Sequence, residues 1–142
     1  MTVGNKRGQS LIEFTLVMPV LLLTMTGMLS FGFALHNYLV LTNGVTAGAQ
    51  LLAVSRGQTA DPCLTGSTAV KSATLGLKAA SLAFTFVING TTYTGTSCTA
   101  GAANLVQGAS AGVSATYPCT LAVIGMNFSA CTLQMETVEL IQ

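Results

Sequence analysis

Four acidic residues, one histidine and four cysteines are the side chains of this chain that are best suited to catalysis or metal binding. The acidic residues are Glu13, Asp61, Glu136 and Glu139. Because Glu136 and Glu139 lie three apart on a predicted strand, their side chains are expected on opposite faces and cannot act as a paired acid and base. No serine, cysteine or aspartate is arranged near His36 to form an activated nucleophile. The sequence therefore predicts no catalytic residue and no enzyme.

The cysteines are predicted to form disulfides rather than a metal site. They are Cys63, Cys98, Cys119 and Cys131. No Cys-x-x-Cys pair occurs and the single histidine lies far away in the sequence, so the spacing does not favour a tetrahedral zinc site. Four cysteines allow three pairings. We favour Cys119–Cys131, which would close the turn between the last two strands, together with Cys63–Cys98. No metal or other cofactor is expected.

The composition excludes several classes of partner. Charged residues make up 6% of the chain and hydrophobic residues 51%, with a formal net charge of +1. A chain this poor in positive charge has no electrostatic basis for binding nucleic acid. No glycine-rich loop precedes a Lys-Ser or Lys-Thr pair, so no nucleotide or other small-molecule substrate is predicted. A surface built from small residues suits a protein packed against lipid or against copies of itself.

An apolar helix near the N-terminus is predicted to cross a membrane. Residues 14–35 carry no formal charge and are long enough for a hydrocarbon core of about 30 Å. Lys6 and Arg7 precede them, so the N-terminus is expected in the cytoplasm and everything after His36 outside, where disulfides persist. The alternative is a cleaved secretory signal. The apolar run is longer than the usual signal core of about 7–15 residues, and no A-x-A-like site closes it.

The same helix is expected to continue from Gln9 to Arg56. Beyond the apolar run, hydrophobic residues recur at steps of three and four, as on one helix face: Tyr38, Leu41, Val45, Ala49 and Leu52. Gly57 suits the left-handed position after the helix, and Pro62 prevents the helix from resuming.

Two features within this helix indicate irregularity or close contact. Pro19 removes a backbone hydrogen bond and favours a kink. Gly27, Ser30 and Gly32 are small enough to let a second helix approach closely. Such residues are also tolerated in ordinary spanning helices, so both interpretations stay open.

Residues 58–66 are expected to form a loop after the long helix. A short helix is then predicted to begin at Ser67 or Thr68 and to end near Ala80, with Val70 and Leu77 buried. The composition of residues 95–112 is too rich in glycine and alanine to predict an element.

Four strands are predicted in the rest of the chain. Alternating large residues indicate a strand over Leu82 to Ile88. The pair Asn89-Gly90 predicts a two-residue hairpin that returns through residues 91–96. Residues 111–118 and 132–141 supply two further candidate strands.

The predicted fold class is therefore α+β. A basic leader-like segment (residues 1–8) precedes the long helix (residues 9–57, with a membrane span of about residues 14–35). An extracytoplasmic domain (residues 58–142) follows, consisting of a small antiparallel sheet stapled by disulfides.

The start of the chain resembles the processing site of type IV pilins. Lys6-Arg7-Gly8 is followed by Gln9-Ser10-Leu11-Ile12-Glu13-Phe14. In that superfamily a prepilin peptidase cuts after the glycine of a short basic leader, and a glutamate stands fifth in the mature chain. More narrowly, residues 8–19 resemble the Val-Glu-Phe-Ala-Leu-Val-Leu-Pro type of run of the TadE-like group. Residues 41–49 resemble the same group's Asn-Ala-Ala-Arg-Glu-Gly-Ala-Arg stretch, and residues 115–118 resemble the group more loosely.

The resemblance implies roles for three residues. Gly8 would be the cleavage residue, Gln9 the new N-terminus, and Glu13 the partner of the new amine of an adjacent subunit, which would set subunit register. A carboxylate in apolar surroundings needs such a cation nearby. If the leader is retained, Lys6 or Arg7 of a neighbouring copy would be the partner instead.

The resemblance implies a structural pilin-like subunit of an extracellular filament, with a role in cell adhesion. Its partners would be copies of itself in a helical filament, the bacterial membrane before assembly, and the prepilin peptidase with the pilus assembly machinery. The alternative is a membrane-anchored extracytoplasmic binding or adhesion module that does not polymerise.

Overall fold

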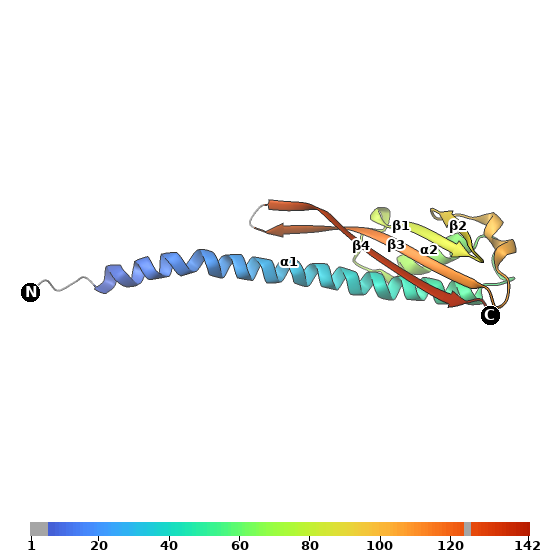
Figure 1. Ribbon diagram of the computed structural model, residues 1–142, viewed down its shortest axis with the longest axis horizontal. Coiled ribbons are helices and arrows are strands. Elements are labelled where there is room, and N and C mark those ends of the chain that lie inside the picture. The colour runs from blue at the N-terminus through green and yellow to red at the C-terminus, as the bar shows by residue number, and fades with distance from the viewer. Residues whose placement is uncertain (1–5, 124–125) are drawn as a thin grey trace, which may run out of the picture.

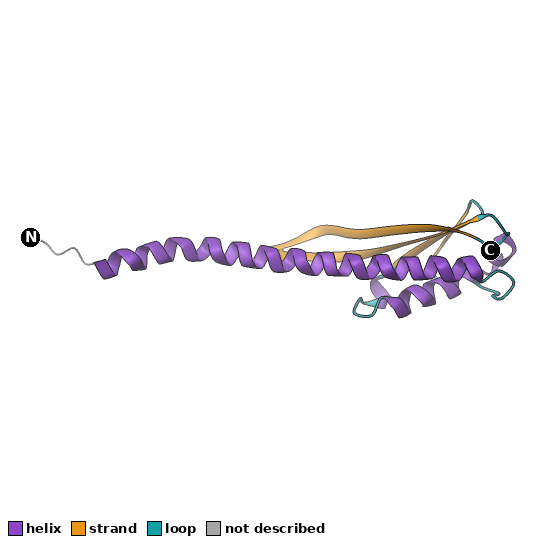
Figure 2. Cartoon of the chain, turned by 90° about the horizontal axis from the view of Figure 1, so that it is seen from below, coloured by secondary structure: helices purple, strands orange, loops and turns teal. Residues whose placement is uncertain are grey.

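A single long helix dominates the molecule. The computed structural model describes the backbone of residues 6–123 and 126–142, and the side chains of residues 11–119 and 131–142. Helix α1 (Lys6–Val54) is 49 residues long and projects well beyond the rest of the chain (Figure 1). Its C-terminal part packs against a small sheet and a second helix, α2 (Pro62–Ala73). The two helices lie side by side on one face of the sheet (Figure 2).

The sheet has four antiparallel strands in the order β2-β1-β3-β4. The strands are β1 (Ala83–Ile88), β2 (Thr91–Thr94), β3 (Ser110–Val123) and β4 (Met126–Leu140). Two short 3₁₀ helices, η1 (Ala79–Ser81) and η2 (Thr99–Asn104), connect the elements. The predicted α+β fold is confirmed: a long apolar helix followed by a small disulfide-linked antiparallel sheet.

The turn between β1 and β2 is the predicted two-residue hairpin. Asn89 has φ of 49° and Gly90 has φ of 76°. A turn with positive φ at both central residues matches the right-handed twist of the strands that it joins. Ile88 pairs with Thr91 on either side of it, and β2 ends two residues before the predicted limit.

Strands β3 and β4 extend further than predicted. Their ladder continues past the pair Cys119↔Cys131 to Val123↔Met126, whereas the predicted strands covered only residues 111–118 and 132–141. Strand β1 stops pairing with β3 at Thr116. Pro118 therefore lies beyond β1, where its missing N–H removes no bond to that strand.

Helix α2 begins earlier than predicted, so the loop expected over residues 58–66 is shorter. Asp61 is the N-cap, and its side chain accepts a hydrogen bond from the Leu64 N–H (3.0 Å). Pro62 occupies the first turn, where a missing N–H costs nothing. The predicted start at Ser67 or Thr68 and end near Ala80 are wrong. Ser67 lies in mid-helix, and the helix ends at Ala73.

The end of α1 differs from the prediction by two residues. The helix ends at Val54 rather than Arg56. Gly57 has the expected left-handed φ, 71°. The C-terminus closes on the same end of the helix, because the Gln142 N–H donates to the Ala53 carbonyl (3.1 Å).

The hydrophobic core lies between the sheet and the C-terminal part of α1. Val70 of α2 and the inward residues of β1 contribute to it, and all its larger members are at most 8% exposed. The principal members are Leu41, Val45, Ala49, Leu52, Val70, Phe84, Phe86, Ile88 and Val113.

Candidate functional site

Helix α1 divides into two segments with different surroundings. We call residues 11–40 the inner segment and residues 41–54 the outer segment. No residue of the inner segment is buried, whereas the outer segment supplies the core residues Leu41, Val45 and Leu52, each with no exposed surface. The exposed surface of the inner segment is strongly apolar: Leu16 is 70% exposed and Met28 is 75% exposed.

The inner segment is compatible with a membrane. By length and hydropathy, α1 is the one helix of the described residues that qualifies as a membrane span, and its most apolar window is not buried within the molecule. Its hydroxyl groups bond to their own backbone: Thr15 donates to Leu11 O (2.8 Å) and Thr26 to Leu22 O (2.8 Å). Since polar groups in lipid must be satisfied internally, these bonds leave the helix exterior effectively apolar.

Glu13 lies exposed on this segment. Within the part of the chain whose side chains are described, no residue bonds to it or pairs with its charge. Gly8 and Gln9 belong to α1, but their side chains lie outside the described residues. The predicted pairing of Glu13 with an amine of another subunit therefore stays a prediction.

Pro19 does not interrupt α1, which continues through it as an α-helix. The helix has an apolar hollow beside the proline, lined by Phe14, Met18, Pro19 and Leu22 among others. Around Gly27 and Gly32 nothing lies within 4 Å of the position where a Cβ would stand. Gly27 and Gly32 are thus not crowded by any described part of the chain.

The glycines of the outer segment are used in a different way. A Cβ added to Gly44 would collide with the Thr74 methyl, and one added to Gly48 would collide with a Val70 methyl. The Cβ added to Gly48 would also lie only 3.2 Å from the carbonyl oxygen of Gly66, which belongs to the backbone of α2. These two glycines, one helical turn apart, allow α2 to lie directly on α1. Sequence reasoning had missed this role, although the four-residue spacing of Gly44 and Gly48 was its visible sign.

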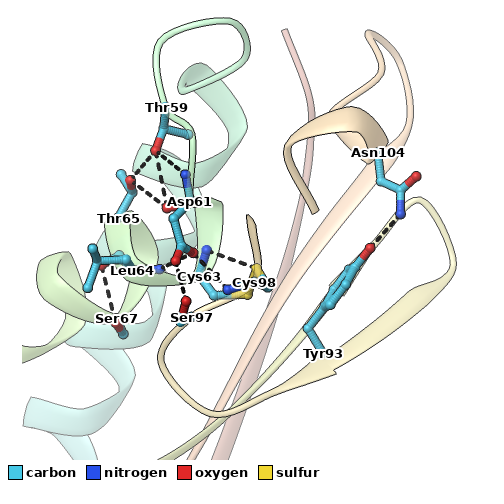
Figure 3. The surroundings of a disulfide bond; sticks show 10 residues. All are labelled: Thr59, Asp61, Cys63, Leu64, Thr65, Ser67, Tyr93, Ser97, Cys98 and Asn104. Atoms are coloured by element: carbon cyan, nitrogen blue, oxygen red, sulfur yellow. Dashed lines mark hydrogen bonds between the residues drawn. A yellow bond between two sulfur atoms is a disulfide. The ribbon is translucent and has the colours of Figure 1, made fainter. Parts of the chain in front are cut away.

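Both disulfides join the pairs that the sequence favoured, Cys63–Cys98 and Cys119–Cys131. The first one connects the start of α2 to the segment before η2 (Figure 3). Asp61 stabilises the same junction, because it accepts hydrogen bonds from the Cys98 N–H (2.8 Å) and the Ser97 hydroxyl. Burial raises the pKa of Asp61, but the bonds from Ser97 and from the backbone of Cys98, Leu64 and Cys63 outweigh this, so its pKa lies below the usual value.

The other residues considered as candidates for chemistry lie in separate parts of the described structure. Asp61, Cys63 and Cys98 approach one another, but the two sulfurs are bonded in a disulfide and offer no thiolate to a metal. His36 is exposed on α1. Glu136 lies on the exposed face of β4, and Glu139 lies on the opposite face. The structure thus brings together the cysteines in two disulfides, whereas the acidic side chains lie apart.

Comparison with known proteins finds one family along most of helix α1. The family model described as "TadE-like protein" matches residues 8–50, which span the whole inner segment and most of the outer one. No curated protein and no solved structure matches the chain. The resemblance noted from the sequence is confirmed: residues 8–50 match the TadE-like family, which is consistent with a TadE-like protein of the Tad system.

Proposed function

We propose that the protein is a structural, pilin-like subunit whose inner segment first anchors it in the membrane and then packs among copies of itself in the core of an extracellular filament. The observation that carries the proposal is the exposed apolar surface of residues 11–40. A helix that is apolar all around is stable only when lipid or protein covers it. The TadE-like match to the same residues supports this role.

Glu13 has a specific part in the proposal. Cleavage after Gly8 by a prepilin peptidase would create an amine at Gln9, one helical turn from Glu13 along the chain. In the filament, Glu13 would pair with the amine of an adjacent subunit. A subunit in the wrong register would leave a charge unpaired in apolar surroundings, which costs several kcal/mol.

The first test is the intact mass of the protein isolated from cells, before and after reduction. Loss of residues 1–8 is expected, together with a gain of four hydrogen atoms when the reductant opens the two disulfides. A full-length mass would show that no amine is created at Gln9, and Lys6 or Arg7 of a neighbour would then be the replacement partner of Glu13.

The second test separates a filament subunit from an anchored module that never polymerises. A polymer is expected in material sheared from the cell surface, whereas an anchored monomer stays in the membrane fraction. Removing one partner of a buried ion pair costs about 3–5 kcal/mol, so Glu13→Ala is expected to lower the sheared yield by more than about tenfold. The matched control is Glu136→Ala, which removes a carboxylate from the exposed face of β4. Normal filaments from the Glu13→Ala variant would contradict the pairing.

A further inference from the structure

The β3–β4 hairpin extends beyond the domain as a two-stranded projection. The β1–β3 ladder stops at Ala83↔Thr116, whereas the β3–β4 ladder continues to Val123↔Met126. We call residues 117–123 and 126–133 the hairpin arm. A two-stranded hairpin is at best marginally stable alone in water. The disulfide Cys119–Cys131 joins the two strands of the arm, which holds it together where β1 no longer does.

The arm runs along α1 toward the N-terminus of that helix. At one end of β4, Gln142 bonds to Ala53. Further along, the Tyr38 hydroxyl lies 3.9 Å from the Met135 sulfur. Cys131 then lines an apolar groove together with Phe31 and Leu35 of α1. Figures 1 and 2 agree that the far end of the arm lies beside the middle of α1.

The end of the arm is level with the expected membrane span. From Cys119 to Val123 the strand advances four residues, or about 13 Å at about 3.3 Å per residue. The same length corresponds to about nine residues of helix. Since Cys131, the partner of Cys119, is level with Phe31 and Leu35, the end of the arm lies well inside the range of residues 14–35.

The composition of the arm suits contact with lipid. Residues 79–135 contain no formal charge. Beyond the disulfide, the paired residues include Leu121↔Phe128 and Val123↔Met126, all four of them apolar. The groove between the arm and α1 is likewise apolar: Phe31 remains 62% exposed and Leu35 47% exposed.

The depth of contact is limited by the strand edges. Both strands of the arm have one edge without a strand partner in the described sheet beyond Thr116, and unpaired backbone groups are excluded from the hydrocarbon core. They are tolerated near headgroups and interfacial water, about 5–10 Å into the boundary between headgroups and acyl chains.

We propose that the hairpin arm lies in the outer leaflet of the membrane, at interfacial depth, before the subunit assembles. This rests on the proposed membrane anchoring of α1. It places the outer membrane boundary near Ser30, so the span covers about residues 11–30 instead of 14–35, and Phe31 and Leu35 lie at the interface. The arm would then set how far the subunit stands out of the membrane.

Single tryptophans can test this, because the chain has no native tryptophan. Phe128→Trp and Met126→Trp each place a reporter in the arm. Leu22→Trp reports on the span, and Val106→Trp reports on the end of the domain furthest from the membrane. The full chain is reconstituted at low density in phosphatidylcholine vesicles that contain lipids brominated either near the headgroup or near the end of the acyl chain. Retention of both disulfides, checked by mass, verifies the fold of each variant.

We expect both arm tryptophans to be quenched, at least about twofold more by the shallow bromines than by the deep ones, as interfacial depth requires. Leu22→Trp should be quenched strongly by the deep bromines, and Val106→Trp should not be quenched. If Leu22→Trp is quenched while both arm reporters behave like Val106→Trp, the arm does not touch lipid and this inference is wrong, whereas the anchoring stands. Blue-shifted but unquenched arm emission would show burial against protein, which also overturns it. An unquenched Leu22→Trp would refute the anchoring and the arm placement together.

Discussion

The inner and outer segments of α1 belong to one uninterrupted helix, yet they differ in almost every contact. Gly27 and Gly32 have open space around them, whereas Gly44 and Gly48 are crowded by α2. Leu22 is 53% exposed and Leu52 is fully buried. Residues of the same type are therefore buried in one segment and exposed in the other. The outer segment is covered by the protein's own sheet and second helix, and the inner one is left for lipid or for another subunit.

The sequence pattern of the two segments reflects this difference. In the outer segment the buried residues lie on one face, and Asn43 and Gln50 lie exposed on the other. An amphipathic pattern of this kind is typical of a helix that packs on one side of a domain. The inner segment lacks a polar face. The boundary between one-sided and all-round hydrophobicity lies near residue 40, and Leu41 is the first buried residue among the described residues of α1.

The largest expected difference between the segments is the effect on stability of truncating one leucine in each of them. Truncating a fully buried leucine to alanine costs about 2–5 kcal/mol, so Leu52→Ala is expected to lower the free energy of unfolding of the domain by that amount. Leu22→Ala should change it by less than about 0.5 kcal/mol, because Leu22 is 53% exposed and substitutions at exposed positions are usually within that range. Urea unfolding of the full chain in detergent micelles measures both. Equal losses would show that the two segments fold as a single unit.

A smaller contrast is expected between glycines. Gly48→Ala places a methyl group against Val70 and near the Gly66 carbonyl, and such overpacking costs about 1–3 kcal/mol. Gly32→Ala meets no atom and should instead gain about 0.5–1 kcal/mol of helix propensity. Thermal unfolding of the domain should therefore move to lower temperature for Gly48→Ala only. A neutral Gly48→Ala would mean that α2 can shift away from α1 at little cost.

Much of this architecture could be predicted from the sequence because its determinants are local. The heptad-like recurrence of Leu41, Val45 and Leu52 predicted the buried face of α1, and Asn89-Gly90 predicted the hairpin from its backbone requirements alone. The start of α2 was also encoded locally, by Asp61 before Pro62. That signal was missed because the proline was interpreted only as a helix breaker, and not as a first-turn residue.

Other features depended on distant parts of the chain. The role of Gly44 and Gly48 follows from the position of α2, which no local pattern specifies. The length of β3 beyond Thr116 depends on pairing with β4, because β1 no longer pairs with β3 there. Glu13 is exposed on the single chain, and the partner proposed for it belongs to a second subunit.

The smallest of these effects should come from Asp61, which stabilises α2 where that helix packs on the outer segment. Losing an N-cap side chain costs about 0.5–2 kcal/mol, so Asp61→Ala is expected to destabilise the domain by about 1 kcal/mol and to leave the inner segment unaffected. Urea unfolding at neutral pH measures this loss. Glu136→Ala is the matched control, since no described residue bonds to Glu136.

The pH dependence isolates the charge of Asp61. Its pKa is lower in the folded domain than in the unfolded chain, because Ser97, Cys98 and Leu64 donate hydrogen bonds to the carboxylate. The stabilisation is therefore complete above the unfolded pKa of about 3.9 and is lost as the pH falls through the folded pKa. Asp61→Asn retains a capping oxygen but does not ionise. The unfolding free energy of this variant should therefore fall less on acidification than that of the parent protein. If the parent protein and Asp61→Asn lose stability in parallel below pH of about 4, the carboxylate charge does not contribute, and the cap acts through hydrogen-bond geometry alone.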